Sequence, residues 1–97
     1  MAELRVTNES NERRLIFFEP YGEDYWLKKG DHLVVHAVDP EGDQPFQVDL
    51  TDDGITVWIN AKSGYITDDE GRELPTGHQR PSDKFPGVPR PPSADPA

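Results

Sequence analysis

The sequence predicts an all-β fold, a small antiparallel sandwich or partly open barrel of six to seven strands with a disordered, proline-rich C-terminal tail. Three observations support this prediction. Apolar and polar residues alternate over short runs, turn-forming residues separate these runs at roughly 8 to 12-residue spacing, and no stretch repeats apolar residues at the 3, 4 and 7 spacing of a helix. Short alternating strands of this kind are typical of sandwiches and barrels.

Alternation and turn chemistry give the expected boundaries. The predicted strands cover residues 3–7, 14–19, 25–27, 32–38, 46–50 and 55–59, with a short seventh at 65–67, and residues 60–64 are expected to form a loop. The clearest element is the hairpin of residues 46–59, in which Thr51 to Gly54 read as a type I turn with Gly54 in the left-handed position. Residues 14–19 are apolar on both faces, which favours a central strand.

The chain divides into a domain and a tail. Seven of its ten prolines lie in residues 75–97, so residues 1–74 are predicted to form the β-sandwich domain and residues 75–97 a disordered tail. Overlapping PxxP spacings in this tail leave a polyproline II ligand as an alternative. A domain of about 74 residues has little core to spare for an internal ligand cavity, so we expect any binding site at its surface.

Charge is concentrated in the predicted domain. Residues 1–74 carry seventeen Asp and Glu against seven Lys and Arg, a balance of −10, whereas the predicted tail is at +1. An acidic surface repels nucleic-acid phosphate and anionic lipid and favours basic partners. We therefore expect no nucleic-acid or membrane binding, and a protein partner for which basic side chains are the favoured complement.

Cysteine is absent, so the sequence excludes disulfides and thiolate sites. Its first residues pass directly into a strand pattern without the charged and apolar run of a signal peptide, and no window has the apolar length of a membrane span. These features are compatible with a cytoplasmic protein, which is the expected location.

Residues 25–35, Tyr-Trp-Leu-Lys-Lys-Gly-Asp-His-Leu-Val-Val, resemble the strand, Gly-Asp turn and strand of cupredoxin-like sandwiches. Cupredoxins hold copper with two His, one Cys and usually a Met, but this chain has no Cys and its one Met is Met1, so the resemblance implies a fold and no copper site. The segment from Val6 to Pro20 is similar to small uncharacterised bacterial β-proteins, a likeness that implies no activity.

Candidate metal sites do not have suitable spacing. His32 and His36 share one strand face, yet four residues at about 3.3 Å each place them too far apart for one ion. Three acidic turns, at residues 39–43, 52–54 and 68–71, lack the EF-hand ligand spacing for calcium. No nucleophile elbow, triad pattern or phosphate-binding loop is present, so the sequence predicts no cofactor, no metal site and no catalytic residue.

The remaining expectation is a non-enzymatic protein-binding module with an acidic surface. Alternation places Trp58 on the outer face of its strand, opposite to Ile55, Val57 and Ile59. The candidate partner-binding residues are aromatic: Trp58, Trp26, Phe18 and Tyr21. The alternatives are a small hydrolase or metal-dependent enzyme, which needs a shielded carboxylate or His cluster, and a structural accessory domain of a larger assembly.

Overall fold

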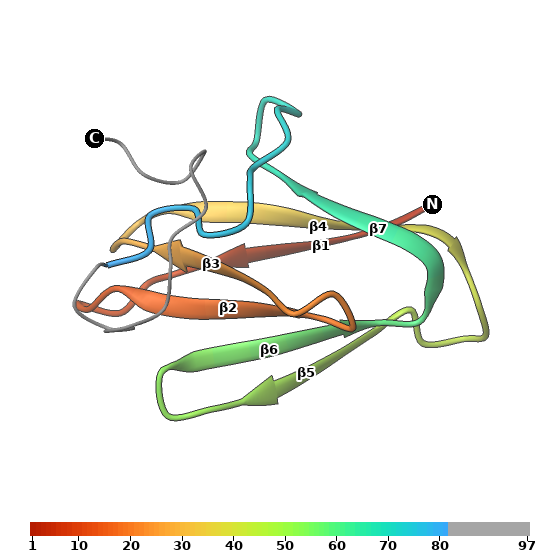
Figure 1. The fold of residues 1–97 in the computed structure, drawn as a ribbon, viewed down its shortest axis with the longest axis horizontal. Helices are drawn as coiled ribbons and strands as arrows, with labels where there is room; N and C mark the ends of the chain where they lie inside the picture. The colour runs from red at the N-terminus through yellow and green to blue at the C-terminus, as the bar shows by residue number, and fades with distance from the viewer. Residues whose placement is uncertain (82–97) are drawn as a thin grey trace.

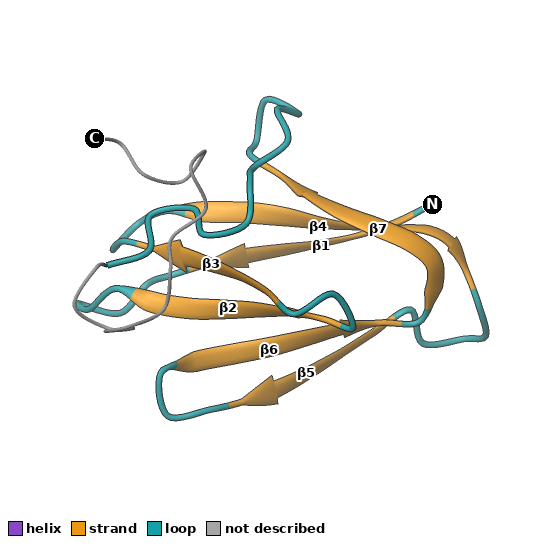
Figure 2. Cartoon of the chain, in the orientation of Figure 1, coloured by secondary structure: helices purple, strands orange, loops and turns teal. Residues whose placement is uncertain are grey.

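The computed structural model describes residues 1–81, which form seven strands in two facing sheets and no helix (Figures 1 and 2). The strands are β1 (Ala2–Thr7), β2 (Arg14–Glu19), β3 (Glu23–Leu27), β4 (His32–Pro40), β5 (Phe46–Leu50), β6 (Gly54–Ile59) and β7 (Ala61–Thr67). The all-β prediction is confirmed, and the sheets are not closed into a barrel. The predicted disorder of residues 82–97 lies outside the described part of the chain.

One sheet has three strands in the order β1-β4-β7 and the other has four in the order β3-β2-β6-β5. Every named pairing is antiparallel except β2 with β6, which is parallel, so the expected antiparallel sandwich is in fact mixed. The parallel pair arises because the chain leaves the four-stranded sheet for β4 and returns, which no local pattern encodes.

The core lies between the two sheets. Its buried side chains come from both, and the largest fully buried ones include Phe18, Leu27 and Leu33. Burial alternates along β4, with Leu33, Val35 and Ala37 pointing inward, as expected for a sheet with one solvated face. The hydrophobic pattern therefore fixes which face of each strand packs inward.

Two glycines lie where a side chain has no room. A Cβ at Gly54 would overlap the Leu15 carbonyl on β2, and Gly54 is not among the residues with positive φ. The predicted left-handed turn glycine is therefore wrong, and the close approach of β2 explains Gly54 instead. A Cβ at Gly64 would likewise overlap the Ile59 side chain and lie 2.7 Å from the His36 carbonyl oxygen. Residues 61–64 thus belong to β7 rather than to the predicted loop.

Residues 75–81 extend the domain beyond the predicted boundary at residue 74. Gly77 N–H donates to the Asp24 carbonyl and Trp26 N–H to the His78 carbonyl, at 2.6 and 2.8 Å, so this segment, which we call the strap, runs along the edge of β3. The Arg80 guanidinium binds the Asp24 carboxylate at 2.5 and 2.8 Å. These contacts show that the assignment of residues 75–81 to a disordered tail is wrong. The local sequence could not reveal them because they join residues far apart in the chain.

Candidate functional site

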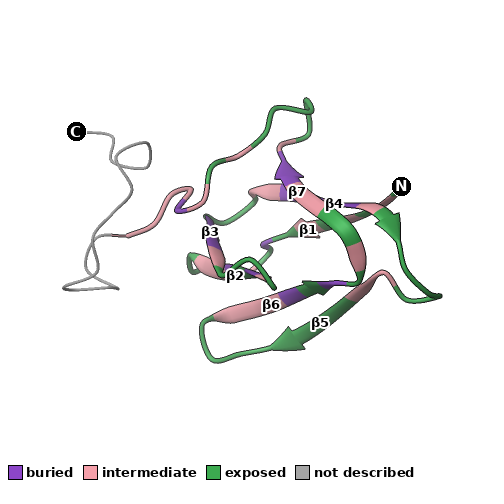
Figure 3. Cartoon of the chain, turned by 45° about the vertical axis from the view of Figure 1, so that its right-hand side comes forward, coloured by how far each residue is buried: buried purple, intermediate pink, exposed green. Residues whose placement is uncertain are grey.

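The candidate site is built on the hairpin of β5 and β6, at one edge of the four-stranded sheet. The two strands form the predicted hairpin, with Phe46 opposite Ile59, Val48 opposite Val57 and Leu50 opposite Ile55. The three-stranded sheet does not cover β5 fully. Val48 is 48% and Leu50 88% exposed, although their cross-strand neighbours are buried or half-buried (Figure 3).

The outer backbone edge of β5 has no strand beside it among the described residues. Asn60 N–H donates to the Pro45 carbonyl and Thr51 N–H to the Gly54 carbonyl, both at 2.9 Å. Because the direction of backbone groups alternates along a strand, the odd-numbered residues of β5 face β6. The N–H and C=O groups of Phe46, Val48 and Leu50 therefore face away from the sheet.

Trp58 lies on the outer face of the same hairpin, as predicted, and is 41% exposed. Its indole Nε1–H donates to Asp49 Oδ2 at 3.2 Å, and Gln47 Nε2 donates to the other oxygen of that carboxylate at 3.1 Å. We call Val48, Leu50, Trp58 and Asp49 the hairpin surface. It has two sides: Val48 and Leu50 are exposed on the inner face of the hairpin, and Trp58 with the Asp49 carboxylate that it binds lies on the outer face.

The other predicted aromatic residues do not form a common patch with Trp58. Phe18 is completely buried in the core, and Trp26 is 2% exposed beside the strap, so the prediction that either ring joins an exposed patch is wrong. Tyr21 is 43% exposed in the β2–β3 turn, where its ring packs against Phe18 with centroids 5.1 Å apart.

Phe17, rather than Phe18, lies on the outer face near Trp58. Phe17 pairs with Thr56 and Glu19 pairs with Trp58, so the two rings occupy diagonal positions on neighbouring strands. Phe17 is 36% exposed. Alternation could not predict which of the two phenylalanines faces outward, because β2 is apolar at both alternating sets of positions.

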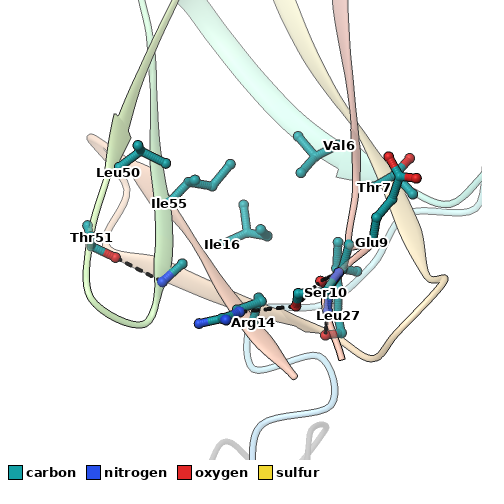
Figure 4. A pocket seen from close by; sticks show the side chains of 12 residues that line it. Val6, Thr7, Glu9, Ser10, Arg14, Ile16, Leu27, Leu50, Thr51 and Ile55 are labelled. Atoms are coloured by element: carbon teal, nitrogen blue, oxygen red, sulfur yellow. Dashed lines mark hydrogen bonds between the residues drawn. The ribbon is translucent and has the colours of Figure 1, made fainter. Parts of the chain in front are cut away.

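An apolar groove of about 400 Å³ opens between the two sheets next to Leu50 (Figure 4). Leu50, Ile55, Ile16 and Val6 point into it from four different strands. The remaining lining residues are Leu27 and, mostly at the rim, Thr7, Asn8, Glu9, Ser10, Arg14, Thr51 and Gly54. Its volume falls within the range of ligand pockets, at about 300 to 1,000 Å³.

One buried side chain, Asn8, holds the rim of the groove. Asn8 Nδ2 donates to the carbonyls of Glu12 and Leu27, each at 2.8 Å, and Asn8 Oδ1 accepts from the N–H and hydroxyl of Ser10. Ser10 Oγ in turn accepts from Arg14 Nε at 3.1 Å. The loop after β1, which forms the rim of the groove, is therefore tied to β3.

All charged side chains in the chain around β5 are acidic. Residues 41–60 contain no Lys or Arg and five acidic residues, Glu41, Asp43, Asp49, Asp52 and Asp53. Cations line only the far rim of the groove, where Arg14 forms an ion pair with Glu12 at 3.3 Å. The free edge of β5 thus combines apolar side chains with negative charge.

His32 and His36 of β4 both have side-chain partners, which come from β7 of the same sheet and from the turn after it. His32 contacts the Asp69 carboxylate, which also binds Arg5 at 3.0 Å. His36 stacks on Tyr65 with centroids 4.5 Å apart, and its Nε2 lies 2.8 Å from Thr67 Oγ1. No three His, Cys, Asp or Glu side chains of residues 1–81 are placed to hold a metal ion.

The pKa values of Asp24 and His78 are shifted where the strap packs against β3. Burial acts to raise the pKa of Asp24, but hydrogen bonds from Arg80 and Trp26 outweigh it and hold this pKa below its usual value. Burial lowers the pKa of the His78 imidazole. Neither residue lines the groove, so these shifts reflect packing of the strap on β3.

Comparison of this chain with protein-family models, curated proteins and solved structures finds no match. The geometry of the hairpin surface and the groove is therefore the basis for a function of this chain. Within residues 1–81 there is no helix with the length and apolarity of a membrane span.

Proposed function

We propose that this chain is a non-enzymatic protein-binding module that binds its partner through the hairpin surface and the adjoining groove. One observation supports the proposal: Val48 and Leu50 are exposed on the face of β5 that turns toward the apolar groove, and Trp58 is exposed on the opposite face of the same hairpin. Large exposed apolar side chains that gather in one place mark interaction surfaces in soluble proteins.

Charge indicates the kind of partner. Apolar anchors surrounded by polar and charged groups resemble the core and rim of a protein interface. No Lys or Arg within residues 41–60 balances the charge of the carboxylates in that segment. A partner with basic side chains beside apolar ones therefore complements this surface.

The enzyme alternatives have less support. His32, His36 and Asp24 each contact other side chains outside the groove, and the groove itself presents mainly apolar carbons. A structural accessory role would depend on the tail, most of which lies outside the described residues. We also propose a cytoplasmic location, on the absence of cysteine, and a cupredoxin-like sandwich without copper, on the resemblance of residues 25–35.

The test begins with a displayed library of random peptides selected against the whole chain. Leu50→Lys places a cation in the groove, and Ser63→Lys makes the same charge change at an exposed position of β7, on the other sheet. We expect Leu50→Lys to weaken binding of selected peptides at least tenfold by calorimetry, whereas Ser63→Lys leaves it within about twofold. Equal effects of the two variants, or no selectable peptide, would contradict the proposal.

A further inference from the structure

The four edges of the two sheets differ in how they are protected. The strap covers β3, β1 carries the exposed charges Glu3 and Arg5, and β7 carries exposed Lys62. Charged side chains and covering segments are the usual means of blocking edge-to-edge pairing. Among the described strands, β5 is the edge that has exposed apolar side chains, no cation and no proline within its bounds.

We infer that β5 accepts an extended segment of the partner as an additional strand. This inference rests on the proposed function and adds the binding mode and the partner's sequence pattern. The backbone groups of Phe46, Val48 and Leu50, which face away from β6, would pair with the incoming strand. Main-chain hydrogen bonds supply affinity in such complexes, and alternate side chains supply specificity.

The alternation of β5 sets the pattern of the incoming strand. Side chains on its inner face lie beside Val48 and Leu50 and above the groove, so they should be apolar. Side chains on its outer face lie beside Gln47 and Asp49 of β5, and Trp58 lies one strand farther, on β6. A long Lys or Arg side chain there meets the Asp49 carboxylate and extends toward the indole ring that this carboxylate binds. The predicted ligand is therefore an extended segment in which apolar and basic residues alternate.

A second copy of this chain fits the edge less well. Two antiparallel β5 strands related by a two-fold axis would bring residues 41–60 of both copies together, and this segment holds five carboxylates and no Lys or Arg. Like charges across an interface oppose association. A basic partner removes this repulsion, which is why we assign the edge to a different protein.

The experiment uses synthetic ten-residue peptides of alternating Lys and Val, with the full chain as receptor. A second peptide has the same composition in two blocks, and two further peptides carry N-methyl groups on one or the other alternate set of amides. We expect the alternating peptide to bind at least tenfold more tightly than the block peptide. N-methylation of one set should weaken binding at least tenfold, and of the other set less than threefold.

Amide hydrogen exchange identifies the edge. In the complex we expect exchange at Val48 and Leu50 to slow at least tenfold, while exchange of the exposed amides of β7 stays unchanged. Failure of the alternating peptide to bind, equal effects of the two methylation patterns, or unchanged exchange at Val48 and Leu50 would overturn the strand-addition model. If library peptides still bind and remain sensitive to Leu50→Lys, the proposed function survives this failure.

Discussion

Arg80 and Asp24 form a two-point ion pair whose side chains are 10% and 9% exposed, although the two residues lie 56 positions apart in the sequence. Asp24 also accepts a hydrogen bond from the Trp26 indole at 2.9 Å. The strap is thus fastened to the outer face of the four-stranded sheet by a charged group that has little contact with water.

Truncation tests whether the strap belongs to the domain. Removal of residues 75–97 exposes the β3 edge and deletes Arg80, so we expect a loss of about 2 kcal/mol or more in the free energy of unfolding, or about 10 °C in melting temperature. Removal of residues 82–97 alone should lower the melting temperature by less than about 5 °C. If both truncations have equally small effects, the strap contributes nothing to stability.

Removing one partner of the ion pair should cost more than removing both. Arg80→Met leaves the Asp24 carboxylate buried without its cation, and such changes typically destabilise by about 3 to 5 kcal/mol. Adding Asp24→Asn removes the uncompensated charge and should recover part of that loss. Chemical denaturation of the native chain and the two variants measures the difference, and a double variant less stable than Arg80→Met would contradict this reading.

The buried imidazole of His78 makes stability depend on pH. Because the pKa of His78 is lowered in the fold, the imidazole of the unfolded chain binds a proton first as pH falls below the ordinary histidine pKa of 6.5. The stability contributed by neutral His78 is therefore full above that pH and decreases as pH falls toward the folded pKa. Melting curves of the native chain and His78→Gln, measured between pH 8 and 5, should converge at the acidic end; parallel curves would exclude this contribution.

Divalent metals should leave the domain unchanged. His32 and His36 already contact Asp69 and Thr67, and Asp68 accepts hydrogen bonds from Arg72 within its own turn. We expect millimolar calcium or zinc to shift the melting temperature by less than about 1 °C, since only specific binding to the fold stabilises by mass action. A saturable shift at micromolar metal would contradict this prediction and point to the acidic turns.

Local sequence patterns predicted most of the fold. The alternation of Phe46, Val48 and Leu50 predicted the first strand of the hairpin, and alternation along residues 55–59 placed Trp58 on the outer face. These features depend on neighbours close in sequence, where a period of two and a short turn leave little choice.

The wrong predictions have a different cause, because each missed feature depends on contacts between residues far apart in the sequence. Leu15, Ile16, Phe17 and Phe18 are all apolar, so alternation could not show which phenylalanine faces water. Trp26 is buried beside the strap, and the composition of residues 75–97 concealed that Arg80 binds Asp24. The groove was also missed, since it forms only when side chains from four strands meet.

The most direct test of the binding proposal is the replacement of Trp58 by alanine. Its ring is exposed and donates one hydrogen bond, to Asp49, so we expect the melting temperature to change by less than about 5 °C, equivalent to about 1 kcal/mol. Affinity for peptides selected against the native chain should fall about thirtyfold or more, the effect of a hot-spot residue worth about 2 kcal/mol. Unchanged affinity in a folded Trp58→Ala variant, or loss of folding, would contradict the account.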